Sequence, residues 1–65
     1  MKIFINGNEE HTESPTLADL IASRGLDAGP LVVELNQQII KQEQWQATSL
    51  NEEDRLELLS FVGGG

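Results

Sequence analysis

The dipeptide Asn6-Gly7 constrains the fold of this chain more than any other feature of the sequence. It directly follows Lys2-Ile3-Phe4-Ile5, a run of β-branched and aromatic residues that is typical of a strand. Asn-Gly is the strongest short signal for a β-hairpin turn. A polar strand near Glu9 to Thr12 is expected to complete the pair. The sequence therefore predicts an antiparallel hairpin at the start of the chain.

A single helix is predicted after the hairpin. Thr16-Leu17-Ala18-Asp19 fits a capping box, and Pro15 stands just before it. Apolar residues then recur at helical spacing, and Gly25 is placed to end the helix. The residues expected on the buried face of this helix are Leu17, Leu20 and Ile21.

The second half of the chain predicts three further strands. Leu31-Val32-Val33-Glu34-Leu35 is almost continuously apolar, which indicates a strand buried on both faces or close to it. A turn at Asn36-Gln37-Gln38 leads into a short strand at Ile39-Ile40, and Arg55 to Phe61 forms the last strand. Between these strands, Gln42 to Leu50 is a polar connection.

Trp45 and Leu50 are the expected anchors of that polar connection. A lone tryptophan in such a segment more often closes the open edge of a small core than stacks on a ligand. The order of elements is hairpin, helix, strand, short strand and final strand. It predicts an α+β fold of the ubiquitin-like β-grasp type, with a mixed sheet of four to five strands and one helix packed on one face. Residues 1–62 are expected to form this domain, and residues 63–65 a flexible tail.

The acidic balance of the chain excludes one class of partner. Eleven acidic residues against four basic ones give a net charge of −7, which repels the phosphate backbone of nucleic acids. Two readings of this charge stay open, because it can simply keep a small protein soluble or can favour a basic partner surface. The apolar run at the N-terminus is too short for a signal peptide, and no stretch approaches the ~20 apolar residues of a membrane span. A cytoplasmic protein without a membrane partner is expected.

The sequence offers no catalytic apparatus of its own. It contains no phosphate-binding loop, no cysteine and no pair of histidines at metal-binding spacing. His11 is interpreted as a solvated surface histidine, and Glu52-Glu53-Asp54 as an exposed turn and not a metal site. The chain is therefore expected not to be an enzyme and to bind neither a metal nor a cofactor itself.

The distinctive chemical feature is Gly63-Gly64-Gly65. At average glycine usage, three glycines at a given place arise by chance with a probability of roughly 0.0003. Without side chains they can enter a narrow slot that a β-carbon would block, and four extended residues from Val62 span roughly 13 Å. The Gly65 carboxylate is ionised at neutral pH and a poor electrophile, so attack on the α-phosphate of ATP would be needed to activate it as an acyl-adenylate. A separate enzyme must supply the ATP site. The alternative is a frayed end on a plain interaction domain.

The last strand also suggests a docking surface. Strict alternation directs Leu56 toward the helix and directs Leu59 and Phe61 outward. In a β-grasp fold the first and last strands are neighbours, so Phe4 is expected to join them in one exposed apolar patch. A bulge near Ser60 would instead turn Phe61 into the core. The predicted docking residues are Phe4, Leu59, Phe61 and Val62.

Several segments resemble the ThiS family of thiamin sulfur carriers. They are Asn36, Gln44-Trp45, Arg55-Leu56-Glu57-Leu58 and Phe61-Val62-Gly63-Gly64-Gly65. The similarity spans the whole chain. The chain departs from the family pattern where a glycine is expected after Asn36, where Pro-Arg is expected after the apolar pair, and where a glycine is expected in the acidic turn. The residues present instead are Gln37, Lys41-Gln42 and Glu52-Glu53-Asp54. These departures affect turns and not the terminus.

The resemblance implies a sequence of reactions at Gly65. A ThiF-like, E1-like adenylyltransferase would adenylate the carboxylate with ATP, and sulfur from a cysteine-desulfurase pathway would convert the adenylate to a thiocarboxylate. Thiazole synthase would then receive the sulfur. The absence of cysteine agrees with this scheme independently, because the chain cannot carry sulfur as its own persulfide.

Three alternatives stay open from the sequence. The first is the small subunit of molybdopterin synthase, which shares the fold and the thiocarboxylate chemistry but is usually longer and ends in Gly-Gly. The second is a ubiquitin-like modifier that joins its terminal glycine to a lysine, or a similar carrier for tRNA thiolation. The third is a non-catalytic interaction domain with an inert tail.

Overall fold

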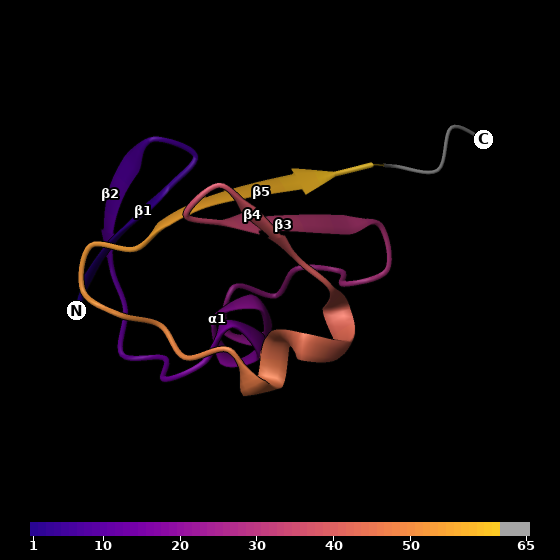
Figure 1. The fold of residues 1–65 in the computed structure, drawn as a ribbon, viewed down its shortest axis with the longest axis horizontal. Helices are drawn as coiled ribbons and strands as arrows, with labels where there is room; N and C mark the ends of the chain where they lie inside the picture. Colours follow the sequence, from indigo (N-terminus) through magenta and orange to yellow (C-terminus); the bar gives the residue numbers. More distant parts are fainter. Residues whose placement is uncertain (62–65) are drawn as a thin grey trace.

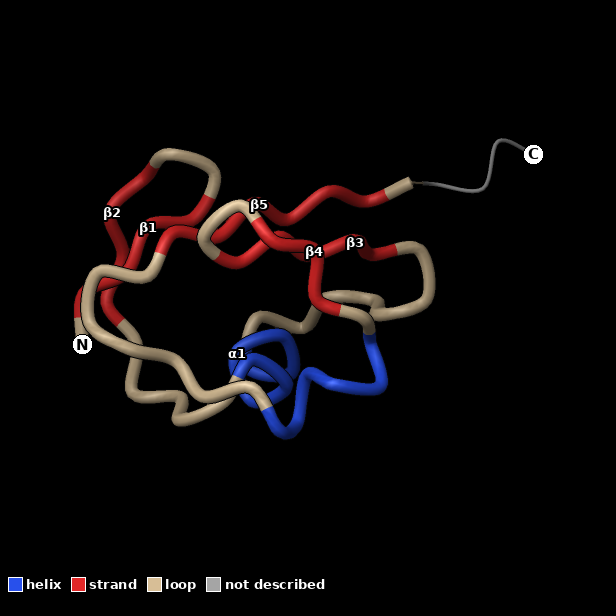
Figure 2. Tube along the Cα trace, in the orientation of Figure 1, coloured by secondary structure: helices blue, strands red, loops and turns tan. Residues whose placement is uncertain are grey.

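The computed structural model describes residues 1–61 of the 65-residue chain, and these residues form a sheet with helical segments on one side (Figures 1 and 2). The described strands lie in the order β2-β1-β5-β3-β4. β1 and β5 run parallel and the other neighbours antiparallel, so the expected β-grasp arrangement with a mixed sheet is confirmed. The elements are β1 (Lys2–Ile5), β2 (Asn8–His11), α1 (Leu17–Ser23), β3 (Leu31–Leu35), β4 (Gln38–Ile40), the 3₁₀ helix η1 (Gln42–Ala47) and β5 (Arg55–Ser60).

The predicted hairpin forms around Asn6 and Gly7. Their φ angles are 51° and 84°, the left-handed values that a two-residue type I′ turn requires at both central positions. The turn sets the register of β1 and β2, in which Ile5 lies opposite Asn8.

The predicted capping of α1 is present in the structure. The Thr16 hydroxyl oxygen accepts a hydrogen bond from the backbone N–H of Asp19 (3.2 Å), and the hydroxyl donates to the Asp19 carboxylate (2.9 Å). At the other end, Gly25 adopts a φ of 68° and donates its N–H to the Ala22 carbonyl. Both ends of the helix are thus determined by residues in or next to it.

The core lies between the sheet and the helical layer. The buried apolar residues of the described chain form one cluster, to which α1 contributes three members and the strands four. They are Ile3, Ile5, Leu17, Leu20, Ile21, Val33, Trp45, Leu50 and Leu56.

The expectation that β3 is buried on both faces or close to it is met only in part. Val33 is fully buried against the helical layer, but Val32 and Glu34 on the other face are only partly covered. The reason is that α1 and η1 lie on the same side of the sheet (Figure 2), and no element of the described chain covers the opposite side. We call this second side the open face.

The polar connection after β4 contains a 3₁₀ helix that the sequence did not predict. Its residues, Gln42–Ala47, lack the apolar periodicity by which helices are recognised. The expected anchors Trp45 and Leu50 are both buried, which confirms their structural role. The indole N–H of Trp45 donates to the Ile40 carbonyl at 2.9 Å, so the burial of this side chain leaves no polar atom unpaired.

Two departures from the family pattern fall in turns with left-handed backbone. Gln37 has a φ of 71° and Glu53 a φ of 68°, a conformation that costs a residue with a β-carbon about 1–2 kcal/mol. We expect Gln37→Gly and Glu53→Gly each to raise the free energy of unfolding by about 0.5–1 kcal/mol, since the relief of strain exceeds the entropic cost of glycine. Urea denaturation measures this effect as a shift of the unfolding midpoint, with the dependence of the free energy of unfolding on urea concentration unchanged.

The neighbouring Gln38 provides the matched control for this prediction. Gln38 is also an exposed glutamine, but it lies in β4, where glycine weakens a strand by about 0.5–1 kcal/mol. Gln38→Gly is therefore expected to lower the stability. The prediction fails if Gln37→Gly and Gln38→Gly shift the unfolding midpoint in the same direction.

Candidate functional site

β5 runs through the centre of the sheet and leads to the predicted tail (Figure 1). The N–H of Asn36 donates to the Arg55 carbonyl at one end of the strand (2.8 Å), and the N–H of Phe61 donates to the Pro30 carbonyl just beyond the other end (3.0 Å). The main chain is therefore held as far as Phe61, the last described residue. Of the predicted site residues, Val62, Gly63, Gly64 and Gly65 lie outside the described residues.

The end of β5 presents apolar side chains on the open face. Leu59 is 44% exposed and Phe61 is 63% exposed. The pairing of β5 with β3 is continuous from Leu56 to Ser60, so no bulge turns Phe61 into the core. Val32 lies opposite Leu59 on the same face.

Phe4 lies elsewhere on the open face. Its Cα partner in β5 is Arg55, whose guanidinium carbon is 4.5 Å from the centroid of the Phe4 ring. Leu59 lies further along β5, by roughly 13 Å at the rise of a strand. The expected single patch is therefore divided, because the parallel register of β1 and β5 aligns Phe4 with Arg55 and not with Leu59.

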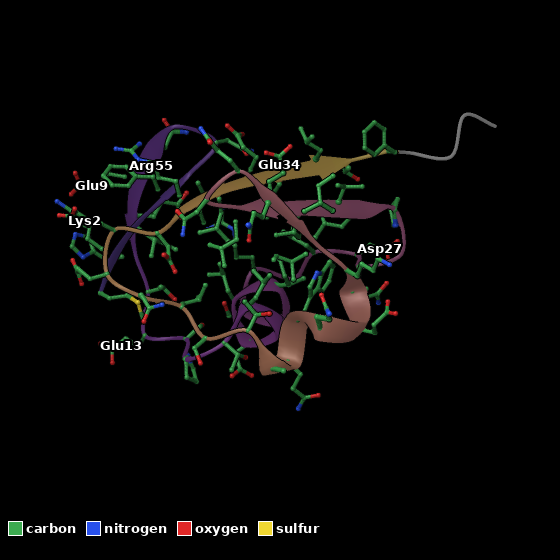
Figure 3. All side chains as sticks on the ribbon, viewed as in Figure 1. Lys2, Glu9, Glu13, Asp27, Glu34 and Arg55 are labelled. Carbon is green, nitrogen blue, oxygen red and sulfur yellow. The ribbon has the colours of Figure 1, made fainter. Side chains whose placement is uncertain are left out.

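A charged band separates the two apolar regions. Glu34 and Glu57 are Cα partners across β3 and β5, and Figure 3 shows Glu34 and Arg55 on the side of the sheet away from α1. A hollow of about 300 Å³ is lined by both glutamates, Arg55, Phe4 and Gln37, among others. The ion pairs formed by the described residues do not involve either glutamate. They are Lys2–Glu53, His11–Glu9 and Arg24–Glu10.

The acidic segment before β5 has a structural role. Asp54 is 6% exposed, and its carboxylate accepts hydrogen bonds from the Asn36 side chain (3.0 Å) and the Asn51 N–H (2.7 Å). The Asn36 side-chain oxygen in turn accepts from the Arg55 N–H (3.0 Å). Glu52 and Glu53 are exposed, as expected for a turn, whereas Asp54 is buried because it joins this turn to the one between β3 and β4.

The remaining candidates for chemistry are placed apart from one another. His11 is exposed, and its Nε2 lies 3.7 Å from a Glu9 carboxylate oxygen. Within residues 1–61, no group of three or more histidine, cysteine or carboxylate side chains is arranged to hold a metal ion. The same part of the chain contains no helix that is long and apolar enough to cross a bilayer.

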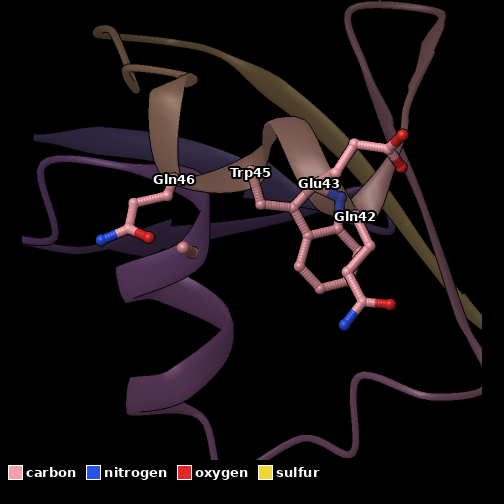
Figure 4. A pocket seen from close by; sticks show the side chains of 5 residues that line it. Gln42, Glu43, Trp45 and Gln46 are labelled. Carbon is pink, nitrogen blue, oxygen red and sulfur yellow. The ribbon is translucent and has the colours of Figure 1, made fainter.

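A larger hollow of about 540 Å³ lies beside Trp45, where η1 packs near α1 (Figure 4). Its lining supplies one carboxylate, that of Glu43, and no nucleophilic side chain. The tryptophan N–H is already bonded to the Ile40 carbonyl. The open face and the end of β5 therefore remain the candidate site.

Sequence reasoning missed the pairing of Glu34 with Glu57. The alternation that directs Leu59 and Phe61 outward also applies to Glu57, but the register that brings Glu34 opposite it is a property of two strands separated by β4 and η1. No signal within either segment specifies this register.

Known proteins resemble this chain in both sequence and fold. The model of the ThiS family matches residues 3–65. The chain belongs to the ThiS family. It is 38% identical over 53 residues to the sulfur carrier protein ThiS of Bacillus subtilis, covering 82% of this chain and 80% of that protein. The crystal structure of the thiamine biosynthesis protein ThiS from Geobacter metallireducens superimposes with a TM-score of 0.86 at 28% identity, over 100% of both chains. The expected ThiS family and β-grasp fold are thus confirmed.

Some of the proteins that are similar in sequence to this chain are much longer than it. The thiazole synthase of Paramagnetospirillum magneticum is 35% identical over 66 residues, which cover 100% of this chain and 20% of that protein. The thiazole synthase of Magnetococcus marinus is 33% identical, with the same coverage. The chain thus spans about a fifth of the length of these relatives.

Proposed function

We propose that this ThiS-family chain is a sulfur carrier for thiamin biosynthesis and that it carries sulfur as a thiocarboxylate on Gly65. The observation that supports this most is that the family match runs through the three glycines to residue 65. The similarity to the sulfur carrier protein of Bacillus subtilis, which covers 82% of this chain, supports the same assignment. The proposal requires Gly65 to be the C-terminal residue of the functional protein.

The proposed chemistry needs three steps at the Gly65 carboxyl group. In the first, a carboxylate oxygen attacks the α-phosphorus of ATP, pyrophosphate leaves, and Gly65 becomes an acyl-adenylate. In the second, the terminal sulfur of a persulfide attacks the carbonyl carbon and AMP leaves. A thiol then cleaves the sulfur–sulfur bond, which leaves the thiocarboxylate on Gly65 and a disulfide on the donor.

The chain acts in this scheme as a co-substrate and not as a catalyst. A ThiF-like adenylyltransferase supplies the ATP site, a cysteine-desulfurase pathway supplies the persulfide, and thiazole synthase receives the sulfur. The two thiazole synthases that contain a segment similar to the whole chain support this last partner. Because ATP is consumed, the proposal places the reaction in the cytoplasm.

We assign the docking of partners to the open face at the end of β5. Leu59 and Phe61 are exposed there beside Val32, and they precede the tail that a partner must hold. Val62, which lies outside the described residues, is proposed as a further docking residue. Phe4 would contribute a separate contact, next to Arg55.

The experiment that tests the function is intact-mass spectrometry after incubation with ATP, a ThiF-type enzyme and a sulfur donor. An exchange of oxygen for sulfur located at Gly65 by fragmentation is expected. An unmodified terminus, with the same enzyme active on another carrier, would contradict the proposal. Conjugation of the chain to lysine side chains would instead identify a protein modifier.

A further inference from the structure

Glu34 and Glu57 form an unusual pair in the middle of the open face. They lie directly opposite each other on antiparallel strands, where Cα atoms are about 4.5–5.5 Å apart. Like charges at such positions repel and destabilise a sheet. Their neighbours Val33 and Leu58 pack toward the core, which keeps both carboxylates on the open face.

No ion pair among the described residues includes either carboxylate, although the Arg55 side chain lines the same hollow. The Arg55 guanidinium lies over the Phe4 ring, and Lys2 pairs with Glu53 at 3.6 Å. Arg24 pairs with Glu10, and Lys41 belongs to none of the ion pairs of the described residues. Two opposed carboxylates are thus left without an ion pair among residues 1–61.

Apolar side chains flank the two carboxylates. Val32 lies two positions from Glu34 and opposite Leu59, and Ile39, which is 67% exposed, lies opposite Glu34. A guanidinium has five N–H donors in a planar fork, so it can donate to two carboxylates at once, and its flat faces pack on apolar groups. The chemistry of this surface therefore fits an arginine that is surrounded by apolar side chains.

We propose that the open face docks the adenylating enzyme and that an arginine of that enzyme inserts between Glu34 and Glu57. This inference rests on the proposed function and specifies the contact that selects the partner. The charges favour this enzyme, because it must bring a chain of net charge −7 close to the polyanion ATP. A cation at the docking face offsets that repulsion and directs the approach of the carrier.

The test compares Glu34→Gln/Glu57→Gln with the unaltered chain. The probe is a purified ThiF-type enzyme, and binding is titrated without ATP, so that it does not depend on the chemistry at Gly65. The double variant is expected to raise the Kd by about tenfold or more and to weaken its dependence on salt. Its unfolding midpoint is expected to stay unchanged or to rise, since the repulsion between the carboxylates is removed.

The matched control is Glu13→Gln/Glu43→Gln. These exposed glutamates lie outside the open face, in the loop before α1 and in η1, and their replacement changes the net charge by the same amount. A change in Kd within about twofold is expected for this control. An equal loss of binding in both double variants would show attraction by overall charge and overturn the inference.

The remaining outcomes separate this inference from the two proposals on which it builds. Unchanged binding by Glu34→Gln/Glu57→Gln, or no binding of the unaltered chain to the enzyme, overturns the arginine contact. Unchanged binding by Phe61→Ser overturns docking through the end of β5. An unaltered chain that binds but gains no sulfur at Gly65 overturns the proposed function. In that case the binding of the two double glutamine variants still shows whether the arginine contact with Glu34 and Glu57 forms.

Discussion

Removal of Gly64 and Gly65 is expected to abolish sulfur loading without changing the unfolding transition. The shortened chain would still end in a carboxylate, but this group would lie roughly 7 Å short of its former reach. A misplacement of only about 1 Å can cost on the order of a hundredfold in rate, so no loading above background is expected. Intact-mass spectrometry measures the loading, and urea denaturation measures the stability.

The stability should be unaffected because the buried core residues of the described chain lie between Ile3 and Leu56. Gly65→Ala is the informative companion variant, since it keeps the carboxylate at the same distance and adds only a β-carbon. Partial loading of this variant would show that the width of the last residue affects the reaction even when the length of the tail is unchanged. Full activity of a chain that carries an uncleaved C-terminal tag would contradict the requirement for a free Gly65 carboxylate.

The second large effect is expected at Trp45. Trp45→Ala should lower the free energy of unfolding by about 3–5 kcal/mol, the usual cost of truncating a buried aromatic residue. A domain of this size has about 3–10 kcal/mol in total, so the variant would lose a large part of its stability. The side chain is only 4% exposed and belongs to the same buried cluster as residues of α1 and the sheet.

Phe61→Ala is the control for the effect of Trp45. Both variants truncate an aromatic residue, but Phe61 is mostly exposed, and its replacement should change the stability by less than about 0.5 kcal/mol. Far-UV circular dichroism must report the unfolding, because Trp45 is the only tryptophan and its fluorescence is lost in the variant. Equal destabilisation by the two variants would contradict the placement of both side chains.

The parts of the fold that the sequence predicted are those that neighbouring residues determine. Asn6 and Gly7 specify the hairpin through their own left-handed backbone, and Thr16 caps α1 through a hydrogen bond to Asp19. The burial of Trp45 was also predictable, since a tryptophan carries a large apolar surface and the polar segment around it offers little else to cover that surface.

The parts that the sequence could not predict depend on how distant segments align. Phe4 lies opposite Arg55 and Glu34 opposite Glu57, and both pairings follow from strand register. The partial exposure of β3 follows from the position of α1 and η1 on one side of the sheet, which the composition of Leu31–Leu35 does not reveal. For the site itself, the sequence identified Leu59 and Phe61 as outward-facing but not the acidic pair next to them.

The central position of β5 has a mechanical consequence if, as proposed, partners hold the protein by its end. Backbone bonds from β1 and β3 hold the two sides of this strand, and the last described bond joins Phe61 to Pro30. A pull along the strand axis from Phe61 would load these bonds together in shear, whereas a strand at the edge of a sheet can be peeled away one bond at a time. Under the proposed function, a partner that holds the chain beyond Phe61 would therefore pull against bonds to two neighbouring strands, and we expect the sheet to resist this pull.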